Sequence, residues 1–120
     1  MEKEKIVVYI DGECFTCAED FLEWKNIVKD FENENIEILF YLHVSDFEIL
    51  KPYLKKWNFS YPIIWDRYNQ FFISNKLSND RLFQVMLLDN NEKVKFVGNP
   101  LCHEGIKEFY YKYLGVNNMN

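Results

Sequence analysis

Residues 6–17, IVVYIDGECFTC, decide the fold of this chain. The first five of them are apolar or aromatic and predict a buried strand. Asp11-Gly12-Glu13 then predicts a turn, because glycine and acidic residues favour turns. The residues that follow repeat their hydrophobic positions close to every 3.6 residues, which predicts an amphipathic helix. Cys14 and Cys17 therefore lie where a strand passes into a helix.

This placement suits thiol–disulfide chemistry. Two cysteines separated by two residues can form a disulfide, and a helix N-terminus stabilises the thiolate of the first one. We therefore expect Cys14 to be the exposed nucleophile and Cys17, one helical turn later, to be the buried resolving thiol. Glu13, Glu19 and Asp20 carry negative charge close by and oppose the thiolate. The pKa of Cys14 is accordingly expected to fall only modestly.

The chain has three cysteines, an odd count that does not suit a small secreted fold held by several disulfides. The third, Cys102, is either a small hydrophobic residue or an additional thiol of the same redox site. Cys14, Cys17, Cys102 and His103 together form a chemically suitable zinc set. Adjacent ligands at 102 and 103 give awkward geometry, however, so we predict no metal site and no cofactor.

Composition limits the classes of partner. At 120 residues, the chain is expected to form a single domain over residues 1–120. A net charge of −5 argues against nucleic acid, which requires clustered basic residues. No apolar run approaches the roughly 20 residues of a membrane span. The compartment stays open between the cytoplasm and a bacterial periplasm or cell envelope reached after removal of a leader, and we favour the envelope.

The remaining sequence predicts alternating strands and helices, followed by a hairpin. Ser45-Asp46 is an N-cap signal for a second helix, and the residue before Pro62 favours extended backbone. Asn90-Asn91-Glu92 predicts the turn of the hairpin. The predicted elements are strands at 6–10 and 36–44 with a helix between them, a helix from 47 to about 57, an extended segment at 61–66, a short helix at 69–77, a hairpin at 83–89 and 93–98, and a last helix opened by Pro100.

Four segments in this order resemble the thioredoxin-like superfamily, and more closely its TlpA-type and AhpC/TSA-type thiol–disulfide oxidoreductases. They are the strand–turn–CxxC unit at 6–17, the segment YPIIWD at 61–66, the hairpin with MLLD at 86–89 and KV at 93–94, and the turn VGNP at 97–100. The resemblance implies an α/β, three-layer fold with helices on both faces of a mixed sheet. Its four predicted strands would have the order 2-1-3-4, with the last hairpin antiparallel.

The resemblance also implies an activity. Cys14 would attack a disulfide in a partner protein or small molecule, Cys17 would resolve the mixed disulfide, and an external electron donor would regenerate the dithiol. Phe15 and Thr16, the two residues between the cysteines, would form the substrate groove together with Phe83 and Gly98.

Three positions depart from the family pattern. Phe83 stands where the family has a cis-proline, so we expect a trans or differently shaped loop there. Val8 replaces a buried aspartate, and Phe15-Thr16 replaces Gly-Pro. The alternative function is therefore a thioredoxin-fold binding or interaction module whose CxxC is redox-inactive. A peroxidase of the peroxiredoxin kind is not favoured, because Asp11 and Val7 occupy the places of its Thr or Ser and its Pro.

Overall fold

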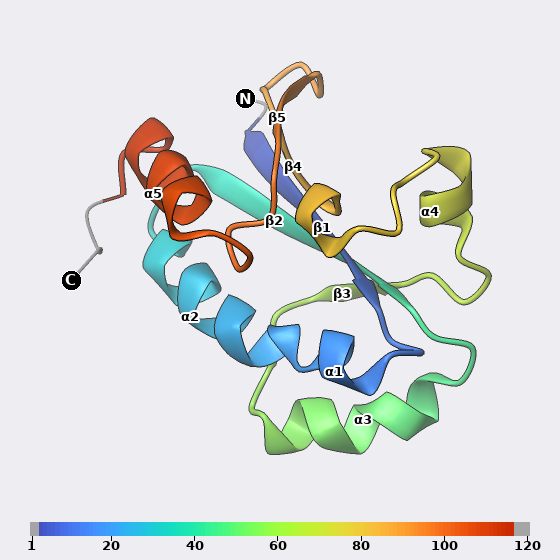
Figure 1. The fold of residues 1–120 in the computed structure, drawn as a ribbon. Helices are drawn as coiled ribbons and strands as arrows, with labels where there is room; N and C mark the ends of the chain where they lie inside the picture. The colour runs from blue at the N-terminus through green and yellow to red at the C-terminus, as the bar shows by residue number, and fades with distance from the viewer. Residues whose placement is uncertain (1–2, 117–120) are drawn as a thin grey trace.

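The computed structural model describes residues 3–116, in which strands and helices follow one another much as the sequence predicts (Figure 1). The elements are, in chain order, β1 (Glu4–Asp11), α1 (Phe15–Ala18), α2 (Asp20–Phe31), β2 (Ile36–His43), α3 (Phe47–Lys56), β3 (Ile63–Trp65), α4 (Gln70–Ser74), the 3₁₀ helix η1 (Arg81–Phe83), β4 (Val85–Leu88), β5 (Val94–Val97) and α5 (Glu104–Tyr113). Within the described residues, no helix is long and apolar enough to cross a membrane.

The strands form one mixed sheet in the order β3-β2-β1-β4-β5. β1 and β2 are parallel along their whole length, from the pair Glu4 and Ile36 to the pair Asp11 and His43. β3 is parallel to β2, whereas β4 is antiparallel to both β1 and β5. The predicted order of four strands and the antiparallel final hairpin are therefore confirmed. The extended segment at 61–66 adds a fifth strand at the edge beside β2.

Alternating side chains of the central strands face two different layers. Ile6, Val8 and Ile10 of β1 join the main core, in which α2, α3 and α5 bury their apolar residues. The opposite face is covered by α4, where the ring of Phe72 lies 5.2 Å from that of Tyr9, measured between centroids. Phe71 stacks on Tyr41 of β2 at 4.0 Å. Helices therefore cover both faces of the sheet, as the three-layer prediction requires (Figure 1).

Three predicted helices have different boundaries in the structure. The short helix expected at 69–77 is limited to α4 (Gln70–Ser74). The helix after the cysteines is interrupted at Glu19, which ends α1 and precedes α2. The last helix does not open at Pro100, because Asn99 first forms a turn in which its carbonyl oxygen accepts a hydrogen bond from the Cys102 amide at 3.0 Å. α5 begins only after His103, whose Nδ1 accepts a hydrogen bond from the Gly105 amide at 3.0 Å.

Candidate functional site

A tight turn at the carboxyl end of β1 positions the two cysteines. The Gly12 amide donates to the carbonyl oxygen of His43 at 2.6 Å, which joins the end of β1 to the end of β2. Asp11 then closes the turn, because its side chain accepts from the Glu13 amide at 3.0 Å and its carbonyl oxygen accepts from the Cys14 amide at 3.3 Å. The first cysteine is thereby fixed at the start of α1.

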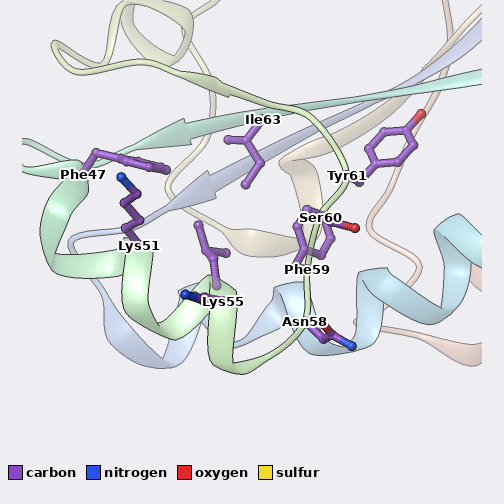
Figure 2. A pocket seen from close by; sticks show the side chains of 9 residues that line it. Phe47, Lys51, Lys55, Asn58, Phe59, Ser60, Tyr61 and Ile63 are labelled. Atoms are coloured by element: carbon purple, nitrogen blue, oxygen red, sulfur yellow. The ribbon is translucent and has the colours of Figure 1, made fainter.

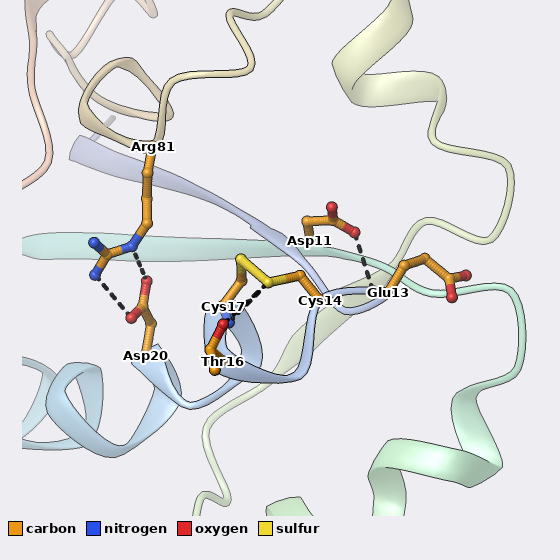
Figure 3. The surroundings of a disulfide bond; sticks show 7 residues. All are labelled: Asp11, Glu13, Cys14, Thr16, Cys17, Asp20 and Arg81. Carbon is orange, nitrogen blue, oxygen red and sulfur yellow. Dashed lines mark hydrogen bonds and ion pairs between the residues drawn. A yellow bond between two sulfur atoms is a disulfide. The ribbon is translucent and has the colours of Figure 1, made fainter.

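Cys14 and Cys17 form a disulfide with their Cα atoms 5.2 Å apart (Figure 3). Cys14 is the N-cap of α1, and its Sγ accepts a hydrogen bond from the Cys17 amide at 3.3 Å. The Thr16 hydroxyl lies 3.3 Å from the same sulfur and donates to it, because a disulfide sulfur carries no proton. Both cysteines are half-buried as whole residues. The expected contrast between an exposed Cys14 sulfur and a buried Cys17 sulfur stays a prediction.

Two of the three nearby acidic residues are held by partners that the sequence did not predict. Glu13 accepts a hydrogen bond from the Ser45 amide at 2.7 Å, and this bond lowers the pKa of its carboxyl group. Asp20 accepts two hydrogen bonds from Arg81, at 2.8 Å from Nε and 2.9 Å from Nη2 (Figure 3). The charge of Asp20 beside the cysteines is therefore neutralised by an arginine that lies far away in the sequence.

Arg81 is the residue that sequence reasoning missed at this site. Asp20 itself carried the signal, because it lies four residues before Trp24 and so on the same, apolar side of the predicted helix. In the structure it is only 9% exposed. A charged residue on the apolar side of a helix is rarely buried without a partner of opposite charge. The sequence could have predicted the need for such a partner, although not its position.

The four predicted groove residues belong to two separate parts of the structure. Phe15 and Thr16 are exposed on α1, and the ring of Phe15 packs edge-on against Tyr53 of α3 at 4.9 Å. The segments carrying Phe83 and Gly98 lie against each other, because the Gly98 amide donates to the Val85 carbonyl oxygen at 2.8 Å. Phe83 is 46% exposed, and Gly98 is buried.

The loop before β4 lies at the same end of the sheet as the disulfide. The Gln84 carbonyl oxygen accepts from the Tyr9 amide at 3.0 Å, near the carboxyl end of β1. The Asn99 amide donates to the Leu82 carbonyl oxygen at 2.9 Å, which joins this loop to the turn that contains Gly98. All peptide bonds between the described residues are trans, including the bond before Phe83. The loop in the family's proline position thus has the trans form that the sequence predicted.

Cys102 lies in the turn before α5 and not inside the helix. It is a free, exposed cysteine. Partial burial of its thiol raises the pKa of Cys102, and the positive charge of Arg81 opposes this shift. Within residues 3–116, no group of three histidine, cysteine or acidic side chains could hold a metal ion.

A pocket of about 440 Å³ opens elsewhere, between α3 and the segment that leads into β3 (Figure 2). Lys51 and Lys55 extend beside it from α3, and Phe59 and Ile63 line its apolar side. None of its lining residues is a cysteine or one of the predicted groove residues. The pocket is therefore separate from the disulfide site.

Solved structures with low sequence identity share this fold. A Chlorobium tepidum protein assigned as a thiol:disulfide interchange protein, DsbE, matches with a TM-score of 0.75 at 14% identity, over 95% of this chain and 82% of that chain. The thioredoxin domain of a thiol-disulfide oxidoreductase from Bacteroides vulgatus matches with a TM-score of 0.71 at 14% identity, over 94% and 80%. A secreted Mycobacterium tuberculosis disulfide oxidoreductase, homologous to E. coli DsbE, matches with a TM-score of 0.60 at 12% identity, over 82% and 70%.

No protein-family model matches the sequence, and comparison with curated proteins finds no match. The closer resemblance to TlpA-type and AhpC/TSA-type proteins stays a prediction. The structural likeness, the strand order and the antiparallel final hairpin all agree with one another. This chain therefore has the thioredoxin-like fold.

Proposed function

We propose that this protein is a thiol–disulfide oxidoreductase in which residues 1–120 act as one domain. The observation that carries the proposal is the Cys14–Cys17 disulfide at the start of a helix, directly after the central strand β1. Solved structures with the same fold include proteins named for this activity. No cofactor is needed, because the two sulfur atoms themselves carry the electrons.

The proposed reaction exchanges one disulfide for another. In the reduced protein, the Cys14 thiolate attacks a substrate disulfide, forms a mixed disulfide and releases the first substrate thiolate. The Cys17 thiolate then attacks Cys14 Sγ, restores the Cys14–Cys17 disulfide and releases the second substrate thiolate. Two electrons pass from the protein to the substrate. An external dithiol donor returns the two electrons and regenerates the reduced protein.

The local geometry supports Cys14 as the attacking residue. Its sulfur accepts hydrogen bonds from the Cys17 amide and the Thr16 hydroxyl, two donors that would favour a thiolate over a thiol. The Asp20 charge, which would oppose a thiolate, is paired with Arg81. Cys17 follows one helical turn later, in reach of Cys14 Sγ.

The surroundings of the disulfide favour a polypeptide substrate. Phe15 lies between the two cysteines, Phe83 lies in the loop before β4 at the same end of the sheet, and both rings are exposed. Exposed aromatic rings bind apolar side chains well. The groove would be completed by Thr16 and by the backbone at Gly98. We place the protein outside the cytoplasm, in a cell envelope, because the M. tuberculosis protein of the same fold is secreted.

Reduction of insulin by dithiothreitol, followed by turbidity, tests the proposal. We expect the wild type to accelerate the reaction and Cys14→Ser to abolish the acceleration. When reduced Cys17→Ser is mixed with insulin without dithiothreitol, it should accumulate a mixed disulfide, because the protein then has no second active-site thiol to resolve it. Cys102→Ser is the matched control, and it should retain wild-type turnover. Equal, negligible turnover by the wild type and Cys14→Ser would instead favour a binding module with a redox-inactive CxxC.

A further inference from the structure

Buried polar residues in the described chain converge on one loop. Between residues 3 and 116, three polar or charged residues are buried: Asp20 at 9%, Gln84 at 8% and Asn99 at 3% exposure. All three contact the loop formed by residues 78–84, which carries Phe83. Buried polar groups are costly unless they are satisfied by hydrogen bonds, so their concentration here indicates a specific role.

Two of these residues hold the loop from outside it. Asp20 on α2 accepts the two hydrogen bonds from the Arg81 guanidinium, which is the bidentate geometry of the stronger ion pairs. Asn99 donates from Nδ2 to the Arg81 carbonyl oxygen at 3.2 Å and from its backbone amide to the Leu82 carbonyl oxygen at 2.9 Å. The loop is thus fastened on one side to α2 and on the other to the turn beside Gly98.

Apolar packing contributes little to this loop. Phe83 is exposed, and Arg81 and Leu82 are half-buried. The third buried polar residue, Gln84, ties the end of the loop to its start, because Nε2 donates to the Ser78 carbonyl oxygen at 2.8 Å. No proline restricts the backbone within residues 78–84. The polar contacts are therefore what determines where Phe83 lies.

We propose that Asp20, Arg81 and Asn99 form a clamp that holds the loop as one wall of the groove through which a polypeptide disulfide reaches Cys14. The inference rests on the proposed oxidoreductase function. The three are positioning residues: the clamp holds Phe83 at the end of the sheet that carries the cysteines and takes no part in the exchange of the disulfide. A substrate too small to contact Phe83 does not need the clamp.

The test compares a polypeptide substrate with a small one. Arg81→Met and Asp20→Asn each remove the ion pair, Arg81→Lys keeps the charge but loses the bidentate geometry, and Arg67→Met alters the chain's other arginine as a control. For each variant, KM and kcat are measured with insulin, and the rate of the reduced protein is measured with 5,5′-dithiobis(2-nitrobenzoate). Amide hydrogen exchange at Gln84, whose N–H donates to the Arg81 carbonyl oxygen at 3.2 Å, reports on the loop independently of activity.

The clamp predicts a specific pattern. Arg81→Met and Asp20→Asn should raise KM for insulin about tenfold, since charge-assisted hydrogen bonds of this strength are lost. Exchange at Gln84 should accelerate in both variants. In the double variant Arg81→Met with Asp20→Asn, which removes both charges, kcat and the rate with the small disulfide should stay at the wild-type level. The KM of Arg81→Lys for insulin should lie between that of the two single variants and that of the wild type. The KM of Arg67→Met should equal that of the wild type. Combining Arg81→Met with Asp20→Asn should add little to either single change.

Other outcomes overturn the inference. If the small-disulfide rate falls by the same factor as the insulin rate, the ion pair acts on the thiols and not on the groove. If KM and the exchange at Gln84 stay unchanged, the contacts do not hold the loop. A wild type that fails to reduce insulin refutes the proposed function and the groove with it. Exchange at Gln84 then still decides whether the contacts hold the loop, so the two failures are distinguishable.

Discussion

Gly12 is a glycine at which an added Cβ would press against the backbone of a neighbouring strand, and Gly12→Ala is therefore a sharp test of the structure. A Cβ atom at this position would lie 2.8 Å from the His43 carbonyl oxygen and 2.8 Å from Cδ1 of Leu50. It would also lie 2.9 Å from Cδ1 of Leu42. Leu42 and Leu50 are both core residues, and the His43 carbonyl oxygen accepts the hydrogen bond from the Gly12 amide. No contact can relax without disturbing the core or the junction of β1 and β2.

The expected cost follows from these contacts. Inserting a methyl group into a well-packed region costs about 1–3 kcal/mol, and three simultaneous contacts place Gly12→Ala in the upper half of that range. For a chain of this size, about 1 kcal/mol of destabilisation lowers Tm by roughly 3–5 °C. We therefore expect Tm to fall by about 6–15 °C. Insulin turnover should also decrease, because the displaced turn carries Cys14.

Thermal unfolding followed by circular dichroism measures this effect, and Gly105→Ala provides the matched control. A Cβ at Gly105 meets only the imidazole of His103, at 3.1 Å, and this exposed side chain can shift, although the shift weakens its hydrogen bond to the Gly105 amide. Alanine is favoured over glycine in a helix by about 0.5–1 kcal/mol, which offsets this loss. Gly105→Ala should therefore unfold close to the wild-type temperature. A Gly12→Ala protein whose Tm stays within about 2 °C of the wild type would refute the reasoning.

Two further predictions concern buried tyrosines. Tyr110→Phe should lower the free energy of unfolding by about 1–3 kcal/mol in urea titrations, because it leaves the Gly98 carbonyl oxygen without the 2.7 Å bond from the Tyr110 hydroxyl. As a control, Tyr68→Phe, at a residue that is 70% exposed, should change the free energy of unfolding by less than about 0.5 kcal/mol. Equal effects of the two substitutions would contradict the stabilising role of the Tyr110 hydrogen bond. Burial raises the pKa of Tyr9 from 10.0 to about 12, so above pH 10 the unfolded chain loses a phenolic proton that the folded chain keeps. The contribution of Tyr9 to stability should therefore be fully present below pH 10 and decline as the pH rises towards 12. Tyr9→Phe should show a smaller decline in the free energy of unfolding. A wild-type free energy of unfolding that stays constant in urea titrations over this pH range would contradict the effect of burial.

Local patterns in the sequence predicted most of the fold. The apolar run at residues 6–10 of β1 and the glycine turn predicted the position of the cysteines, and the helix between β1 and β2 required their parallel pairing. The predicted helix boundaries were less accurate where a side chain forms hydrogen bonds with nearby backbone groups. Asn99 forms a turn that delays α5 until after His103, and periodicity alone does not reveal such a turn.

The candidate site was predictable only in its local part. Cys14, Cys17 and Thr16 lie within four residues, so their mutual contacts follow from helix geometry. The pairing of Asp20 with Arg81 spans 61 residues and depends on how the loop before β4 returns to α2. A single sequence contains no local signal for such a contact. Its effect on the charge around the cysteines was therefore missed.

The face of the sheet that α4 covers indicates where an insertion can be placed in the chain. Five-residue α4 is attached to the sheet mainly by the rings of Phe71 and Phe72, and Ile73 is 60% exposed. Asn75 and Lys76, which follow it, are exposed. α4 itself lies on the opposite side of the sheet from α1 (Figure 1). Exposed segments of this kind tolerate insertions, new chain termini and fluorescent labels. A peptide tag placed between residues 75 and 76 will thus leave the face that carries the disulfide free for its partners.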